Sequence, residues 1–158
     1  MTDERTNGRR VYHYTARHHA DEIAATGAID RGGIPIPTRT GDSLSGIVRG
    51  YQWLTTDARW AQGWATTQKI RCDRTECRLV VLIPERQTHR LLPWSEVARD
   101  FGYRPEIARR FAALGTGSDP ATWYVFEGPI PYEWVALVED RPAATSDSLL
   151  ENVRGAGL

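Results

Sequence analysis

The sequence of 158 residues lacks any long apolar run, and this absence argues against membrane-spanning helices. A helix that crosses a bilayer needs about 20 apolar residues, and no stretch approaches that length. Residues 1–5 also lack the apolar core of a signal peptide. We therefore expect a protein of the cytoplasm that has no membrane partner.

The chain also lacks a net charge and has almost no lysine. Its 20 basic and 20 acidic residues balance, which excludes a global electrostatic attraction to nucleic acid or membranes. Lys69 is the one lysine, so arginine supplies nearly all the positive charge. Because the guanidinium fork suits phosphate and carboxylate groups, a local arginine site remains possible. A GC-rich genome is the alternative explanation of this bias.

Cysteine is scarce as well. Cys72 and Cys77 are five residues apart, and no further Cys or His pair completes a zinc set at finger-like spacing. We therefore predict no metal site. We expect reduced thiols in the cytoplasm, although a tight loop between the two cysteines would allow a disulfide.

Length and composition fit one domain of the α+β class. Hydrophobic residues make up 41% and charged residues 25% of the chain, as in ordinary globular proteins. Strands in mixed order with short helices predict α+β. We expect this domain to span residues 10–140, between a flexible N-terminus at 1–9 and a flexible tail at 141–158.

Hydrophobic periodicity and turn residues predict the elements. Strands are predicted at residues 11–15, 51–55, 79–83, 123–126 and 134–138. Helices are predicted at 16–26, 57–67, 94–101 and 105–114. The first helix is expected to begin at Thr15 as N-cap and to stop at Gly27, and Thr56 or Asp57 is expected to cap the second. Residues 31–44 are rich in Gly and Pro and predict a long loop, with an extended piece at 34–36.

A histidine lies near the end of the first predicted strand. His13 alternates between Tyr12 and Tyr14, and the first predicted helix follows directly. A strand end before a helix is a common position for a ligand-binding side chain. A packed or surface histidine is the alternative interpretation, so the other motifs along the chain decide between the two.

Four short motifs occur in an order that resembles the ADP-ribosyltransferase superfamily. They are His13-Tyr14-Thr15, Ile23 with Gly27-Ala28-Ile29, Trp53-Leu54-Thr55-Thr56, and the stretch 123–131. Their order and spacing over residues 10–140 are similar to bacterial DNA ADP-ribosyltransferase toxins and NAD-dependent RNA 2′-phosphotransferases. The resemblance implies a split mixed or antiparallel sheet with short flanking helices.

The resemblance also implies NAD as co-substrate. It assigns His13 to the ribose hydroxyl on the adenosine side and the backbone of Tyr14 to the nicotinamide amide. Thr15 is expected to support the same strand end. The basic side chain of Arg49, just before the second strand, is a candidate for the pyrophosphate.

Two aromatic residues of the second strand are candidates for stacking on nicotinamide. Tyr51 and Trp53 alternate with Gln52 and therefore share one strand face. Core packing is the alternative for both rings. Thr55 is expected to line the pocket beside them.

A carboxylate is expected to stabilise the developing oxocarbenium ion and to activate the acceptor. Glu127, after the late aromatic strand, is the nearest match in chain order to the glutamate of the family. This position differs from the pattern of the poly-ADP-ribose polymerases. In those proteins the glutamate stands just before the strand, and this chain has Thr122 there. Glu76, with Arg74 near a phosphate, is an alternative, as is the absence of a catalytic carboxylate. Residues 73–76 also fit a simple turn.

These expectations favour an NAD-dependent mono-ADP-ribosyltransferase that releases nicotinamide and modifies DNA, RNA or protein. A toxin, a phage-borne modifier and an anti-defence factor all fit. Two alternatives remain: an NAD-dependent RNA 2′-phosphotransferase, for which Arg17, His18 and His19 are available, and a binding or inhibitor protein without turnover. Acceptor contacts are expected at 31–44 and 94–114. The oligomeric state is undetermined.

Overall fold

The computed structural model describes residues 8–38, 44–60, 74–113 and 119–143, and the structural statements that follow refer to these residues. The strands are β1 (Arg9–Thr15), β2 (Ala28–Ile29), β3 (Gly33–Pro37), β4 (Leu44–Arg49), β5 (Tyr51–Thr55), β6 (Cys77–Ile83), β7 (Leu91–Pro93), β8 (Trp123–Glu127), β9 (Ile130–Pro131) and β10 (Val135–Asp140). The α-helices are α1 (Arg17–Thr26), α2 (Trp94–Asp100) and α3 (Pro105–Ala113). Short 3-10 helices are η2 (Glu85–Arg90), η3 (Pro120–Thr122) and η4 (Tyr132–Trp134).

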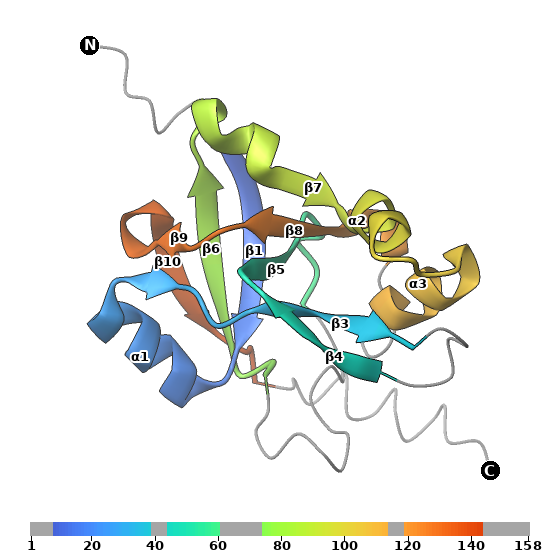
Figure 1. Cartoon of the computed structure of the whole chain (residues 1–158). Coiled ribbons are helices and arrows are strands. Elements are labelled where there is room, and N and C mark those ends of the chain that lie inside the picture. The colour runs from blue at the N-terminus through green and yellow to red at the C-terminus, as the bar shows by residue number, and fades with distance from the viewer. Residues whose placement is uncertain (1–7, 39–43, 61–73, 114–118, 144–158) are drawn as a thin grey trace, which may run out of the picture.

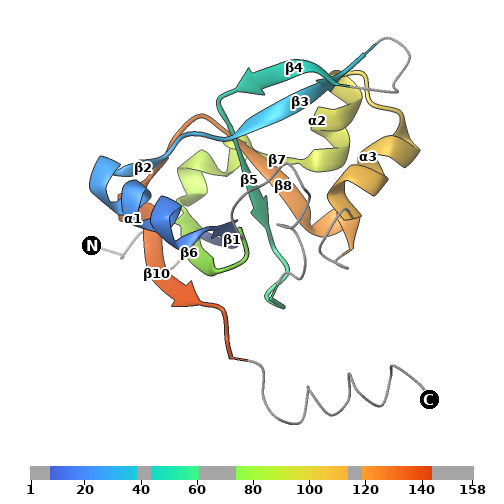
Figure 2. The ribbon, with the colours of Figure 1, turned by 90° about the horizontal axis from the view of Figure 1, so that it is seen from below.

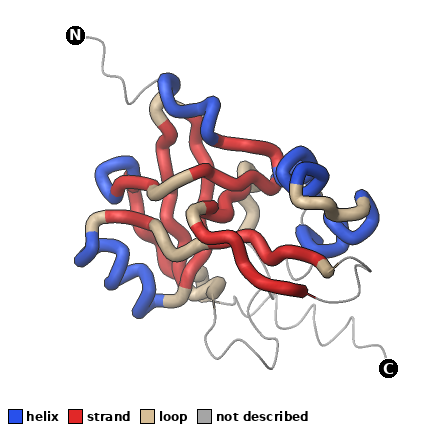
Figure 3. The backbone as a smooth tube through the Cα atoms, in the orientation of Figure 1, coloured by secondary structure: helices blue, strands red, loops and turns tan. Residues whose placement is uncertain are grey.

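A six-stranded sheet in the order β10-β6-β1-β5-β8-β7 forms the centre of the molecule. Helices lie around its rim (Figure 3). The predicted α+β class is confirmed. The mixed sheet that we allowed for is not observed in the described ranges, where each pair of neighbouring strands in this sheet is antiparallel.

The alternation of side chains along the strands builds one core on each face of the sheet. We call them the α1 face and the α2 face, after the helix that covers each. Buried members on the α1 face include Val11, Leu54, Leu79, Phe126 and, from the helix, Ala20. Buried members on the α2 face include Trp123, Val125 and, from the helices, Trp94, Ala98 and Ala108.

The sheet divides between its two central strands. β1 pairs with β6 through seven residue pairs, and β5 pairs with β8 through five. Between β1 and β5 the register holds one pair, Tyr12 with Thr55. In Figure 1, β1 and β6 run side by side up the view, while β8 and β7 run across it. Pairing in this sheet is therefore least extensive between β1 and β5, beside His13, and we call this junction the split.

Residues 31–44 contain a strand of a hairpin in place of the predicted long loop. β3 pairs with β4 from Gly33 opposite Arg49 to Pro37 opposite Leu44. The extended piece predicted at 34–36 is confirmed. The prediction of a long loop was wrong, because the sequence analysis did not recognise β4 as the strand that pairs with this piece. Prolines are tolerated in such an edge strand. The hairpin lies along α2 (Figure 2), where the Tyr103 hydroxyl donates to the carbonyl of Pro35.

The first helix ends as predicted but begins differently. Gly27 has φ 86° and its N–H donates to the carbonyl of Ile23, which confirms the stop. Thr15 is not the N-cap, because it is the buried last residue of β1 and Ala16 precedes the helix without a side-chain bond. The carboxylate of Glu76 instead accepts the N–H of Arg17 at 3.2 Å. A residue distant in sequence therefore caps this helix.

The predicted helix at 57–67 is wrong in the part that the structure describes, since residues 57–60 are not helical. The Thr55 hydroxyl accepts the N–H of Asp57 at 3.1 Å, and the Asp57 carboxylate accepts the N–H of Arg59 at 2.9 Å. These local bonds compete with a helix and form turns, so neither Thr56 nor Asp57 caps one. Residues 61–67 lie outside the described ranges.

Both predicted tails overlap the described structure. β1 begins at Arg9. At the other end, the N–H of Arg141 donates to the carbonyl of Glu76, and its guanidinium donates to Thr75. Residues 1–7 and 144–158 lie outside the described ranges. The ordered domain therefore extends slightly beyond both predicted boundaries.

We predict that Gly32→Ala destabilises the fold. A Cβ at Gly32 would collide with the carbonyl oxygen of Tyr51 and lie 2.6 Å from Oε1 of Gln52. We expect the free energy of unfolding in urea to fall by about 1–3 kcal/mol, as for other overpacked sites. Gly46→Ala is the matched control, because a Cβ there meets nothing within 4 Å. Equal unfolding curves for the two variants would contradict the crowding at Gly32.

Candidate functional site

The imidazole of His13 bridges the two halves of the sheet. Its Nδ1 lies 2.9 Å from the carbonyl oxygen of Trp53 on β5. Because a carbonyl oxygen only accepts, Nδ1 carries the hydrogen, and Nε2 of the neutral ring is an acceptor. The His13 side chain thus links β1 and β5 next to the pair of Tyr12 and Thr55. Its Nε2 atom retains a lone pair that can accept a hydrogen bond.

The surroundings of His13 keep its ring neutral. Burial lowers the pKa of His13, the hydrogen bond to the Trp53 carbonyl opposes this, and the positive charges of Arg74 and His19 lower the pKa further. At neutral pH, Nε2 is therefore available to accept a hydrogen bond from a hydroxyl group. The segment that carries Arg74 reaches the start of α1, because the carboxylate of Glu76 accepts the N–H of Arg17 at 3.2 Å.

The rings of Tyr51 and Trp53 belong to the aromatic core of the α2 face. Trp53 lies 4.6 Å from Trp94 and 6.5 Å from Trp123 between ring centroids, and Tyr51 contacts Phe101 at 5.7 Å. The two rings share a face, as predicted. His13 lies on the opposite face, so Trp53 contributes its backbone carbonyl to the histidine while its ring packs among other aromatic residues.

Residues 30–33, which we call the strap, cross β5 next to the split. The backbone N–H of Gly32 donates to Oε1 of Gln52 at 2.8 Å, and the indole N–H of Trp53 donates to the carbonyl of Gly33 at 3.0 Å. The guanidinium of Arg49 donates to the carbonyl of Arg31 at 3.0 Å. Arg49 therefore holds the strap in this structure.

Gln52 is a residue that the sequence analysis missed. It is fully buried on the α1 face, and its Nε2 has no hydrogen-bond partner among the described residues. A buried glutamine in a strand of aromatic and apolar residues is a signal that the sequence offers. Its role, which is to accept the N–H of Gly32 in the strap, depends on a contact across the chain that the sequence does not contain.

Three predicted site residues support the structure around the split. The Tyr14 hydroxyl donates to the carbonyl oxygen of Arg59 at 3.0 Å, and the Thr55 hydroxyl donates to the hydroxyl oxygen of Thr122 at 3.2 Å. Thr15 is buried at the end of β1. These side chains hold segments on either side of the site, and in the described structure none has a hydrogen bond to His13.

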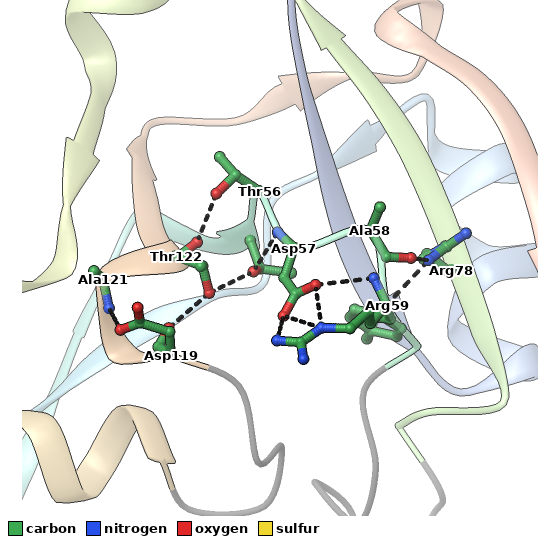
Figure 4. Close-up of polar contacts among 10 residues, drawn as sticks. Thr56, Asp57, Ala58, Arg59, Arg78, Asp119, Ala121 and Thr122 are labelled. Atoms are coloured by element: carbon green, nitrogen blue, oxygen red, sulfur yellow. Dashed lines mark hydrogen bonds and ion pairs between the residues drawn. The ribbon is translucent and has the colours of Figure 1, made fainter.

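Figure 4 shows how the segment after β5 is fixed. Asp57 and Arg59 form an ion pair at 2.8 Å, which lowers the pKa of Asp57 through the hydrogen bond from the guanidinium. Thr56 donates its N–H and hydroxyl to the carbonyl of Thr122, and the Thr122 hydroxyl donates to the carbonyl of Asp119. These hydrogen bonds therefore fix the segment after β5 close to the junction between the two halves of the sheet.

Basic side chains from three elements gather beside His13. His19, in the first turn of α1, contacts His18 with ring centroids 4.1 Å apart and the ring planes tilted by 50°. Its pKa is lowered by burial, by His18, Arg74 and Arg31, against the opposing charge of Glu22. We call His13, His19 and Arg74 the basic cluster. The sequence analysis named His19 with Arg17 and His18 as available for a phosphate group, but it did not connect His19 with Arg74.

The two candidate carboxylates lie in different surroundings. Glu127 is exposed at the end of β8, opposite Tyr51 on the α2 face, whereas His13 is on the α1 face. Glu76 binds the first N–H of α1, the helix that carries His19. The structure thus places Glu76 at the start of α1, the helix that covers the α1 face, and leaves Glu127 on the α2 face.

No described group of three or more His, Cys, Asp and Glu residues is arranged to hold a metal ion. Cys77 has a buried thiol without a disulfide, and burial raises its pKa. None of the described helices has the length and apolar character to cross a membrane. No protein-family model, curated protein or solved structure matches this chain. Inference about function therefore rests on the geometry at the split.

We predict that the stability of the fold falls with pH partly through His13. The pKa of His13 is lowered in the folded state, so below the ordinary histidine pKa of about 6.5 the unfolded chain binds a proton that the folded chain resists. The stability is therefore complete above this pH and declines below it. Unfolding in urea from about pH 8 to about pH 5 should show a smaller decline for His13→Gln than for wild type.

Heteronuclear NMR of the ring provides the control for this interpretation. His13 should titrate at lower pH in the folded protein than in urea, and the neutral ring should carry its proton on Nδ1. Parallel stability curves for wild type and His13→Gln, together with a proton on Nε2, would contradict the assigned hydrogen bond.

Proposed function

We propose that this protein is an NAD-dependent mono-ADP-ribosyltransferase that releases nicotinamide and modifies a macromolecular acceptor. The observation that supports it best is the neutral His13 ring, held by the Trp53 carbonyl where β1 and β5 part. In the families that this chain resembles, the corresponding histidine contacts a ribose of NAD. Nε2 of His13 suits that contact because it is a hydrogen-bond acceptor beside the split.

The edge of β1 supports a second contact with NAD. The β5 ladder meets β1 at Tyr12 alone, so β5 forms no ladder with the backbone from His13 to Thr15. Backbone donors and acceptors at such an edge suit a planar amide. We assign the nicotinamide amide to the backbone of Tyr14, whose side chain is already engaged with Arg59.

The reaction breaks one bond and forms one. The bond from ribose C1 to the nicotinamide nitrogen breaks, and nicotinamide leaves with the electron pair. The acceptor then attacks C1 and gives up a proton. A carboxylate near the ribose stabilises the developing positive charge and takes that proton. We favour Glu76 over Glu127 for this role, because Glu76 lies at the start of α1, the helix that covers the α1 face, whereas Glu127 lies on the α2 face.

NAD-dependent transfer of a 2′-phosphate from RNA is the second candidate. The basic cluster favours it, since His19 and Arg74 beside His13 suit a phosphate group. The two candidates differ in product: phosphotransfer yields ADP-ribose 1″,2″-cyclic phosphate, whereas ADP-ribosylation yields a modified acceptor. A fold that binds NAD without turnover would release no nicotinamide in either assay.

We predict that His13→Ala abolishes nicotinamide release and NAD-dependent thermal stabilisation. The loss follows from removing both the ribose acceptor and the link to β5. Nicotinamide is measured by chromatography after incubation with NAD and mixed DNA, RNA and protein acceptors. His89→Ala, an exposed histidine of η2, is the matched control and should release nicotinamide as wild type does. Equal release by His13→Ala and wild type would exclude the proposed site.

We predict that Glu76→Gln lowers nicotinamide release far more than Glu127→Gln, by about 100-fold or more for a general base. Because Glu76 also caps α1, its variant is compared at a temperature where both variants are folded, and ADP-ribose affinity is measured alongside. Retained affinity with lost release identifies a role in the reaction. The reverse order of the two variants would return the role to Glu127.

A further inference from the structure

Arg74 gives the basic cluster a permanent positive charge, and no described carboxylate pairs with it. Glu22 is paired with Arg31 at 2.7 Å, and Asp140 forms an ion pair with Arg17. Glu76 accepts the N–H at the start of α1. These three described carboxylates therefore already have partners.

Arg74 differs from these arginines. Its side chain is exposed, and no carboxylate in the described ranges pairs with it. It stands two residues before Glu76, whose carboxylate accepts the N–H of Arg17 at the start of α1, and its charge lowers the pKa of both His13 and His19. The charge of Arg74 disfavours protonation of His19, and an anion bound beside both residues relieves this repulsion. The arrangement therefore favours an anionic ligand at this point.

The position of the cluster limits which part of a ligand it meets. His13 comes from β1, His19 from the first turn of α1, and Arg74 from the segment before β6. The three elements converge at the end of β1, since β1 leads directly into α1 and Thr15 pairs with Cys77 at the start of β6. A group bound by His19 and Arg74 thus lies next to a group bound by Nε2 of His13. In a dinucleotide, the diphosphate lies next to the ribose.

We propose that Arg74 and protonated His19 bind the diphosphate of NAD, adjacent to the ribose contacted by His13. This inference rests on the proposed function for the identity of the ligand. It replaces Arg49 as the expected diphosphate contact, because the guanidinium of Arg49 is bonded to the carbonyl of Arg31. Arg74 provides a permanent charge, while His19 provides one that depends on pH.

The sign of the pH dependence follows from the groups that face His19. In the unliganded protein, His18, Arg74 and Arg31 disfavour its protonation and Glu22 favours it, and burial also disfavours it. His13, from β1, is the remaining titratable neighbour. A bound diphosphate adds negative charge and favours the protonated ring. Affinity for the diphosphate therefore rises as the pH falls, with uptake of a proton by His19.

The test is the affinity for ADP-ribose, measured by calorimetry at about pH 6 and about pH 8 for wild type, His19→Gln, Arg74→Gln and His18→Gln. The diphosphate diester keeps its charge over this range, so a pH effect reports on the protein. Wild type and His18→Gln should bind about 10-fold more tightly at the lower pH. His19→Gln should lose most of that dependence, and Arg74→Gln should bind about 10-fold or more weakly at both pH values.

Nicotinamide release by the same four proteins separates this inference from the proposed function. The expected variant effects on ADP-ribose, without nicotinamide release from NAD, would support the diphosphate site and exclude the transferase. Nicotinamide release with unchanged ADP-ribose affinity in both His19→Gln and Arg74→Gln would overturn the diphosphate site and leave the transferase standing. Absence of ADP-ribose binding in folded wild type would overturn the diphosphate site.

Discussion

The hydrogen bond between the His13 ring and the Trp53 carbonyl lies at the point on which the arrangement of the sheet depends. Each half of the sheet is a continuous antiparallel ladder, and the halves share one residue pair, Tyr12 with Thr55. The imidazole adds a side-chain bond across the same junction. It also fixes the tautomer of the ring, so one contact both joins the halves and leaves Nε2 as a hydrogen-bond acceptor at their junction.

The strand β5 makes this arrangement possible by serving both cores. Gln52 points to the α1 face and Trp53 to the α2 face, yet their side chains hold adjacent residues of the strap, Gly32 and Gly33. The strap crosses β5 closely because Gly32 has no Cβ. The junction between β1 and β5 is therefore bordered by a fixed backbone, which suits a site that must hold a ligand in one orientation.

Sequence patterns predicted the elements whose signals are local. The strand with His13, the stop at Gly27, the apolar strand at residues 79–83 and the two helices after Trp94 were all foreseen to within a few residues. Alternation also placed Tyr51 and Trp53 on one face correctly. These features depend on neighbours along the chain, so periodicity and turn residues were sufficient.

Features that depend on contacts across the chain were not predictable in this way. Glu76 caps α1 from 59 residues away in sequence. The strand β3 pairs with β4, although the prolines of β3 had led to the prediction of a loop. The face of Glu127 follows from strand register, which chain order does not contain. Arg74 and His19 come together only because Thr15 pairs with Cys77, so the basic cluster is a product of the fold.

The central claim is that the junction beside His13 is where NAD binds. A crystal structure of the protein with bound ADP-ribose tests it most directly. The account predicts a ribose hydroxyl at about 2.8 Å from Nε2 of His13, with Nδ1 still on the Trp53 carbonyl. ADP-ribose bound elsewhere, with Nε2 of His13 turned into the protein interior, would contradict it.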